Sequence, residues 1–226
     1  MKAIMLSIKP NWCRLIGLKQ KTVEIRKTRP TTDLPFKCYI YCTLDGDYLT
    51  SVNGELQKLN EISLDLKQSS IIRELNGRII GEFVCNEITY LGNISTDPWE
   101  RLLGNVHEEH KRLVIKAACL TERQLHEYGG KYAWHISDLV FYKEPKELSE
   151  FVIPCKEYNK ENPRCGDCNY YYSECNDSIG FYEECCCEGL KPLIRPPQSW
   201  CYVEKNKLKS GNVITNEYNS ECSTFI

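Results

Sequence analysis

Charged residues alternate with β-branched residues near the start of the chain, in the segment KTVEIRK (residues 21–27). β-Branched residues favour extended structure, so the segment predicts a strand whose side chains point to alternate faces. Val23 and Ile25 then share one face, and Glu24 and Arg26 share the other. A carboxylate and a guanidinium held side by side on a rigid strand can recognise polar groups of a ligand.

Two further cations, Lys21 and Lys27, stand at the ends of this strand. A lysine ammonium acts as a compact positive charge, whereas the guanidinium of Arg26 binds planar anions through two donors. Together with Glu24, these residues predict a recognition surface. An ordinary solvated face is the alternative, since half-buried strands show the same alternation of apolar and polar residues.

A second group of reactive side chains lies in residues 155–201, which hold eight of the fourteen cysteines. A C-x-x-C pair brings two thiolates to the separation that a tetrahedral metal needs. All four histidines precede this segment, so a metal site within it would use thiolates alone. We expect structural zinc, with Cys165, Cys168, Cys185 and Cys187 as its ligands. An iron–sulfur cluster, disulfides and free thiols are the alternatives.

The cysteines of the first 150 residues are dispersed among apolar residues. A cysteine in such surroundings behaves as a small hydrophobic side chain. We therefore expect burial and no metal for Cys13, Cys38, Cys42, Cys85 and Cys119.

Strands and helices along the first 145 residues must position the charged segment. The patterns predict strands over residues 2–7, 21–27, 37–43, 78–91 and 131–142. They predict helices over residues 11–18 and 105–118, and a third helix that begins at a capping box of Thr121 and Gln124. Residues 54–76 have helical spacing and form an insertion. This order predicts an α+β fold, a small mixed β-barrel with flanking helices.

The composition changes abruptly after Pro154, where apolar periodicity disappears. We expect three parts: a barrel over residues 1–150, a small cysteine-rich module over 151–204 that binds zinc, and a polar tail over 205–226. A module of about 50 residues has too small a core to fold without a staple such as a metal.

Three ordered motifs resemble those of ASCH domains, which are PUA-like barrels. LSIKPNW and GLKQKTVEIRKTRP (residues 6–30) are similar to the signature that runs roughly G-x-x-K-T-x-E-x-R. RIIGEF (residues 78–83) is similar to the central strand of that family, and YAWHISDL (residues 132–139) to its closing strand. The resemblance covers residues 1 to about 145 and implies a PUA-like barrel of α+β class.

The resemblance also implies a cleft that receives RNA or modified nucleosides. Its lining residues would be Lys21, Glu24 and Arg26, with Lys27 and His135 close by. Arg26 would clamp a phosphate, Lys21 would act as a positive charge, and Glu24 would accept from an exocyclic amine. Binding of RNA or a modified nucleoside is therefore the function that we expect.

A hydrolase acting on RNA or a modified nucleoside is the alternative, with Lys21 and Glu24 as its catalytic residues. The motif of the acetylcytidine amidohydrolases, G-x-K-T-x-T-x-R, is similar around Lys21. Glu24 stands where that branch has a threonine, and no counterpart of its distal glutamate is found. A third alternative is a protein-partner adaptor that acts through the cysteine-rich module.

Charge is distributed unevenly along the chain. Residues 1–37 contain nine Lys or Arg and two acidic residues, whereas the rest contains 20 basic and 29 acidic residues. A basic surface can attract a polyanion although the net charge is −2. With 42% hydrophobic and 27% charged residues, no long apolar run and no signal-peptide pattern, we expect a cytoplasmic protein.

Overall fold

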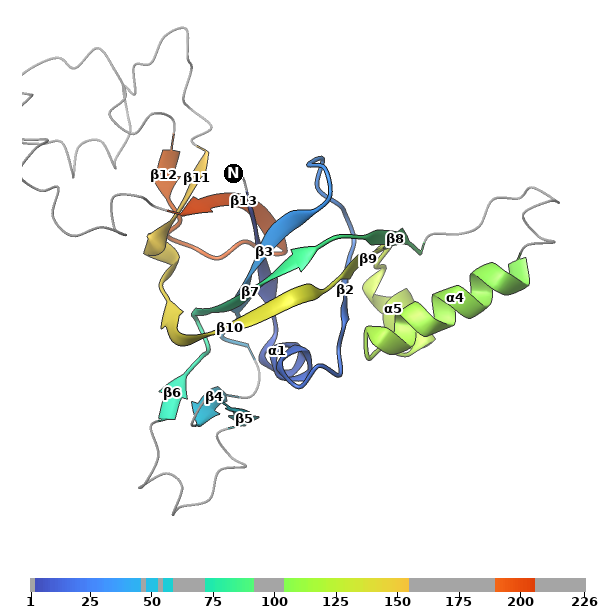
Figure 1. The fold of residues 1–226 in the computed structure, drawn as a ribbon, viewed down its shortest axis with the longest axis horizontal. Coiled ribbons are helices and arrows are strands. Elements are labelled where there is room, and N and C mark those ends of the chain that lie inside the picture. Colours follow the sequence, from blue (N-terminus) through green and yellow to red (C-terminus); the bar gives the residue numbers. More distant parts are fainter. Residues whose placement is uncertain are drawn as a thin grey trace, which may run out of the picture. The chain divides into compact units, whose positions relative to one another are not determined.

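The structure is a computed structural model of the chain, and it describes residues 3–45, 48–52, 55–58, 72–91, 104–154 and 190–205. The chain divides into two compact units, and Figure 1 labels the helices and strands of both. The larger unit comprises Ala3–Lys146 together with Pro197–Trp200, and the smaller unit comprises the remainder.

The larger unit begins with a strand, a helix and two further strands. These are β1 (Ala3–Ile8), α1 (Pro10–Gly17), β2 (Val23–Arg26) and β3 (Phe36–Cys42). Pro10 is the first residue of α1, where its missing N–H is not needed. The predicted strands and the predicted helix are thus confirmed in this part of the chain.

Shorter strands and two helices complete the larger unit. They are β4 (Leu49–Val52), β5 (Glu55–Lys58), β6 (Ile72–Glu74), β7 (Ile79–Cys85), β8 (Ile88–Tyr90), α4 (Gly104–Ala117), α5 (Glu122–Tyr128), β9 (Tyr132–His135) and β10 (Ser137–Lys146). The smaller unit contains the short helix η2 (Leu148–Glu150) and the strands β11 (Phe151–Pro154), β12 (Leu190–Pro192) and β13 (Trp200–Lys205), of which Trp200 belongs to the larger unit.

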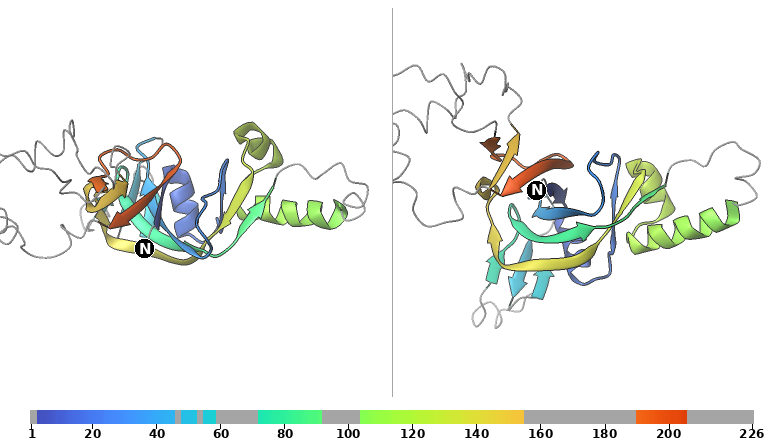
Figure 2. Two further views of the ribbon diagram at one scale, coloured as in Figure 1. Left: turned by 90° about the horizontal axis from the view of Figure 1, so that it is seen from above. Right: turned by 45° about the horizontal axis from the view of Figure 1, so that its top comes forward.

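The strands of the larger unit pair in three sets. The first has the order β10-β7-β3-β1, in which β1 and β3 are parallel and the other pairs antiparallel (Figure 2). The others have the orders β2-β9-β8 and β5-β4-β6. In the smaller unit β11 pairs with both β12 and β13. The α+β class and the mixed sheet are confirmed, although the pairings among the described strands do not close into a barrel.

The helices α4 and α5 pack against one face of β2 and β9. Their contact forms a hydrophobic cluster whose buried members are Val23, Ile25, Leu91, Val114, Ile115, Ala118, Leu125 and Ala133. The predicted capping box starts α5, because Thr121 and Gln124 each bind the backbone of the other. Gly129 ends the helix in the left-handed region with φ +67°.

Three local predictions about secondary structure are wrong, and the first is the single strand 78–91, which forms the two strands β7 and β8 in different sets. The helix predicted from the spacing over residues 54–76 is wrong at both ends, because residues 55–58 and 72–74 form strands that pair with β4, and residues 59–71 lie outside the described ranges. Short apolar repeats fit either structure until a partner strand decides between them. The predicted strand 131–142 is divided at Ile136, and β10 continues to Lys146.

The expectation of buried cysteines is confirmed for four of the five dispersed ones, namely Cys13, Cys38, Cys42 and Cys85, whereas Cys119 is half-buried. Burial raises the pKa of Cys85 to about 11 and holds the pKa values of Cys13 and Cys38 well above their usual range. These thiols therefore stay protonated and pack as hydrophobic side chains.

Candidate functional site

A tight turn after α1 brings Lys21 back beside the helix. Lys19 adopts the left-handed conformation with φ +57°, and the backbone N–H of Lys21 donates to Leu15 O over 3.0 Å. The next residue, Thr22, donates to Ala117 O at the end of α4 over 2.9 Å. The start of β2 is thus fixed between two helices, and the Lys21 side chain is held at a defined position.

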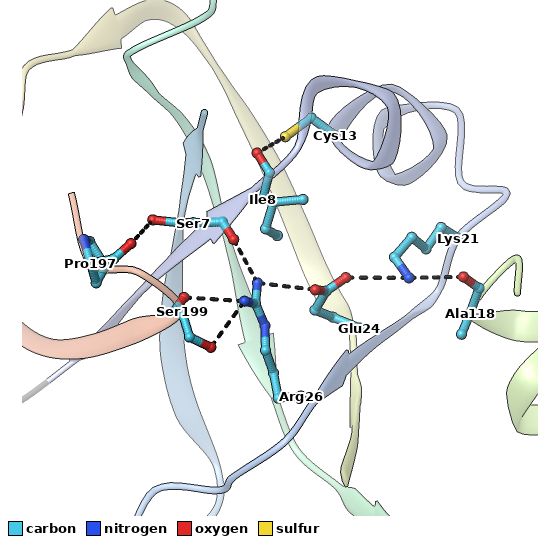
Figure 3. A network of polar contacts seen from close by, with 9 residues as sticks. All are labelled: Ser7, Ile8, Cys13, Lys21, Glu24, Arg26, Ala118, Pro197 and Ser199. Carbon is cyan, nitrogen blue, oxygen red and sulfur yellow. Dashed lines mark hydrogen bonds and ion pairs between the residues drawn. The ribbon is translucent and has the colours of Figure 1, made fainter. Parts of the chain in front are cut away.

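Three charged side chains meet on the polar face of β2, and we call them the inner cluster: Lys21, Glu24 and Arg26. Glu24 lies between the two cations (Figure 3). Its Oε2 is 3.3 Å from Lys21 Nζ, and its Oε1 is 3.0 Å from Arg26 Nη2. Lys21 Nζ also donates to Ala118 O over 2.8 Å, at the C-terminal end of α4 where a positive charge is favoured.

Arg26 joins three segments that lie far apart in the sequence. Its Nη2 donates to Ser7 O over 2.9 Å. Its Nη1 donates to Ser199 O over 3.2 Å and to Ser199 Oγ over 3.3 Å. We call the four residues Pro197–Trp200 the strap, since they return to the larger unit from the far end of the chain. The guanidinium is therefore occupied by protein acceptors on both of its terminal nitrogens.

The inner cluster is buried. Lys21 is 3% exposed, Glu24 7% and Arg26 4%. The interpretation of this strand as a solvated face is therefore wrong, because the strap contacts Arg26 and the backbone of Ala118, just after α4, contacts Lys21. With two cations and one carboxylate, the cluster has an excess of one positive charge.

A cavity of 390 Å³ adjoins the inner cluster, and all of its lining residues belong to the larger unit. Its wall is formed by Ser7, Ile8, Lys9, Trp12, Lys21, Glu24, Ile25, Arg26, Thr43, Asp45, Leu120, Gln124, Tyr128 and Gln198. This volume lies within the range of about 300–1,000 Å³ that is typical of small-ligand sites. The cavity thus has room for one nucleoside-sized group.

Two aromatic side chains of the cavity wall lie beside lysines. Lys21 Nζ is 5.0 Å from the centre of the Trp12 ring, and Lys27 Nζ is 5.2 Å from that of Tyr128. Burial raises the pKa of Tyr128, and the positive charge of Arg26 acts in the opposite direction. The Tyr128 hydroxyl therefore remains a neutral group beside the inner cluster.

Of the predicted site residues in and beside β2, the structure brings Lys21, Glu24 and Arg26 together. Lys27 does not line the cavity and contacts its edge through Tyr128. His135 pairs with Val23 in the register of β2 and β9, so it lies on the face opposite Glu24. Its Nε2 is 2.9 Å from Thr89 Oγ1. A contact between His135 and a ligand of this cavity is not supported by its position.

The four predicted zinc ligands, Cys165, Cys168, Cys185 and Cys187, lie outside the residues that the structure describes. Within the described ranges, no group of three or more His, Cys, Asp or Glu side chains is arranged to hold a metal ion. Zinc in the cysteine-rich module therefore stays a prediction.

Four residues that complete the site were not among the predicted site residues. Trp12, Gln124, Tyr128 and Gln198 line the cavity. Trp12 belongs to the motif LSIKPNW, and Gln124 belongs to the predicted capping box. The sequence around these two residues therefore carries a recognisable pattern. Ser199, which holds Arg26, has no such signal, because it is 173 residues away from it in the chain.

No model of a protein family matches the chain, and no curated protein matches it. Among solved structures it is similar to the ASCH protein of Zymomonas mobilis, with 16% identity and a TM-score of 0.42 over 90% of this chain and 88% of that one. Two single-substitution variants of the same protein also match. One has 18% identity and a TM-score of 0.38 over 66% and 77% of the two chains. The other has 16% identity and a TM-score of 0.41 over 90% and 89%.

These identities and TM-scores are too low to transfer a function or a residue's role to this chain. No helix among the described residues is long and apolar enough to cross a membrane.

Proposed function

We propose that this protein binds single-stranded RNA or a modified nucleoside in the cavity beside the inner cluster. The observation that carries the proposal is a buried cluster with one uncompensated positive charge on the wall of a cavity of 390 Å³. Lys9 and Asp45, which also line the cavity, carry opposite charges and leave this excess unchanged. Buried charge favours a ligand that brings negative charge or an electron-rich oxygen.

The rest of the cavity wall suits a nucleoside. Trp12 and Tyr128 offer aromatic surfaces, on which bases of single-stranded nucleic acids stack. The volume admits one such unit and excludes a double helix. The excess of Lys and Arg in residues 1–37 would attract a polyanion toward this end of the chain.

Binding to a fluorescently labelled single-stranded RNA, measured by anisotropy at two salt concentrations, tests the proposal. We expect Lys21→Met to weaken binding by about tenfold, which corresponds to about 1.4 kcal/mol. Since Lys21 is buried, the exposed Lys9 provides a second variant, Lys9→Ala, that leaves the core unchanged. Lys37→Met is the matched control, because Lys37 does not line the cavity.

The proposal fails if the unmodified protein binds no RNA and no nucleoside, or if Lys21→Met and Lys9→Ala both bind as the unmodified protein does. Thermal unfolding of each variant separates a loss of binding from a loss of folding.

A hydrolase remains the alternative function, and one observation favours it. Lys21 Nζ and Glu24 Oε2 are 3.3 Å apart at the wall of the cavity, within reach of the same ligand. Incubation with RNA and with modified nucleosides, followed by separation of the products, tests this alternative. Turnover that Glu24→Gln abolishes, while RNA binding persists, would establish it over binding alone.

The zinc module and the adaptor function belong to residues outside the described ranges and rest on the spacing of the cysteines. Elemental analysis of the purified chain tests the metal. We expect one or more zinc ions per chain, and a content far below one overturns the prediction.

A further inference from the structure

We infer that Gln198 and Gln124 recognise the hydrogen-bonding edge of a nucleobase in this cavity, so that the site selects among bases. The inference rests on the proposed function, and it names the part of the nucleic acid that enters. It predicts that the base lies within the cavity and the phosphates lie outside it.

The strap places Gln198 at the cavity through contacts on both of its sides. Pro197 O accepts from Ser7 Oγ over 2.5 Å, and Ser199 O accepts from the backbone N–H of Ser7 over 3.0 Å. Trp200 Nε1 donates to Thr28 Oγ1 over 3.0 Å. The backbone of Gln198 is thus fixed. Gln198 is an exposed residue that lines the cavity, and its carboxamide has no hydrogen-bond partner in the described part of the chain.

Gln124 is held in one orientation by the capping box. Its Oε1 accepts from the backbone N–H of Thr121 over 2.9 Å and lies 3.2 Å from Thr121 Oγ1. Since the oxygen is occupied, the Nε2 group is the remaining donor of this side chain. Among described residues Nε2 has no partner, so a ligand in the cavity can accept from it.

A third polar group of the wall also lacks a partner. Thr43 Oγ1 is buried and makes no hydrogen bond to any described residue. A buried hydroxyl without a partner is costly, and a ligand that supplies an acceptor or a donor would satisfy it. The cavity wall therefore presents three uncommitted polar groups beside the inner cluster, in which Arg26 Nε is also buried and lacks a hydrogen-bond partner among the described residues.

These groups suit a base better than a phosphate. A phosphate accepts hydrogen bonds only, so it would use the amide donors of the glutamines and leave the carbonyl oxygen of Gln198 without a donor. Both terminal nitrogens of Arg26 are already occupied by Glu24, Ser7 and Ser199, which leaves no free fork for a phosphate. A base edge presents donors and acceptors together, and a carboxamide matches it in two hydrogen bonds.

Affinities for four single-stranded RNAs of equal length, each made of one base, test the inference. We expect the unmodified protein to prefer one base by about tenfold, the discrimination of a single good base contact. Gln198→Ala and Gln124→Ala should each reduce this preference to less than about threefold, with little change for the least favoured RNA. Gln20→Ala is the control, because Gln20 is exposed and does not line the cavity.

Equal affinity for the four RNAs, or an unchanged preference in both glutamine variants, overturns the inference and leaves the proposed function standing. Failure of the unmodified protein to bind any of the four RNAs or the free nucleosides overturns the proposed function itself.

Discussion

The inner cluster and a second cluster of the larger unit each join a lysine to a glutamate, and they differ in burial as well as in distance. The inner cluster has its Lys21–Glu24 pair at 3.3 Å with side chains 3% and 9% exposed. The second, which we call the outer cluster, comprises Lys37, Glu82 and Tyr142. Its lysine and glutamate are closer, at 2.6 Å, but their side chains are 41% and 19% exposed.

The comparison indicates that the N–O distance alone does not determine how much stability is lost when one partner of an ion pair is removed. Water screens the outer cluster and replaces the partner of either charge when the pair is broken. The inner cluster has no such replacement, so each of its charges depends on the others. A protein gains little stability from such an arrangement, since hydrophobic residues would fill the space as well. Its presence at a cavity favours a role in ligand binding.

The largest expected effect comes from removing the central carboxylate of the inner cluster. Glu24→Gln leaves Lys21 and Arg26 buried without a counter-charge, and we expect the free energy of unfolding to fall by about 3–5 kcal/mol. The matched change in the outer cluster, Glu82→Gln, should lower the free energy of unfolding by about 1 kcal/mol or less, because water can solvate the Lys37 ammonium. Urea unfolding of both variants measures the difference.

Equal losses in the two glutamine variants would contradict the comparison. Added salt provides a second criterion, because screening weakens exposed pairs more than buried ones. The difference between the two variants in the free energy of unfolding should therefore widen with added salt or stay constant. A difference that disappears with salt would show that the inner cluster is open to solvent.

A smaller effect is expected from Arg26→Lys, which keeps the positive charge and removes the forked donor set. A single ammonium cannot reach Glu24, Ser7 O and Ser199 together, since these acceptors surround two different nitrogens of the guanidinium. We expect the free energy of unfolding to fall by about 2 kcal/mol, the value of a hydrogen bond to a charged group. A loss as small as that of Glu82→Gln would show that charge alone holds the cluster.

The sequence predicted the strand that carries the inner cluster, because the alternation in residues 21–27 and the proline at the start of α1 are local signals. It could not predict burial of that strand's polar face. The cover is supplied by the backbone of Ala118 and by the strap, which are 97 and 173 residues away from the side chains that they bind. No local pattern records contacts of that separation.

The short strands were unpredictable for a related reason. Leu56 belongs to an apparent helical repeat, yet β5 pairs with β4, and the partner strand determines the conformation of such a short segment. The register of β2 and β9 likewise decided that His135 faces away from Glu24. The sequence alone did not fix this register.

Alkaline pH should lower the free energy of unfolding through ionisation of Tyr39, which lies near Glu82 of the outer cluster. Burial, aided by the charge of Glu82, raises the pKa of Tyr39 from 10.0 to about 12. Between these values the unfolded chain has lost a proton that the folded chain keeps, so the free energy of unfolding falls as pH rises from 10 to 12. Below pH 10 this stabilisation is fully present.

Tyr39→Phe removes the ionising group and should flatten this fall, as measured by urea unfolding at several pH values. Tyr90→Phe is the control, since the Tyr90 ring is 58% exposed. Cys85, whose pKa is raised to about 11, contributes a similar fall from pH 9 in every variant, so the difference between variants isolates Tyr39. Identical pH profiles for the two phenylalanine variants would contradict the assignment.

The smallest expected effect on stability comes from Ser199→Ala, and this variant tests whether Ser199 positions the inner cluster for ligand binding. Ser199→Ala removes one acceptor of Arg26 Nη1 and keeps the backbone acceptor of the same residue, so we expect a loss of about 1 kcal/mol. Ser137→Ala is matched, because Ser137 Oγ also makes one hydrogen bond, to Val84 O over 2.8 Å, and lies outside the cavity wall.

Both serine variants should therefore lose similar stability, and RNA affinity distinguishes them. Ser199→Ala loosens the guanidinium that orients Glu24 at the cavity, so we expect its affinity to fall several-fold while that of Ser137→Ala is unchanged. If both variants bind RNA as the unmodified protein does, the strap supports the fold and leaves the orientation of Glu24 to the other contacts of Arg26. If RNA affinity falls in Ser199→Ala alone, the strap contributes to ligand binding although it is distant in sequence from β2.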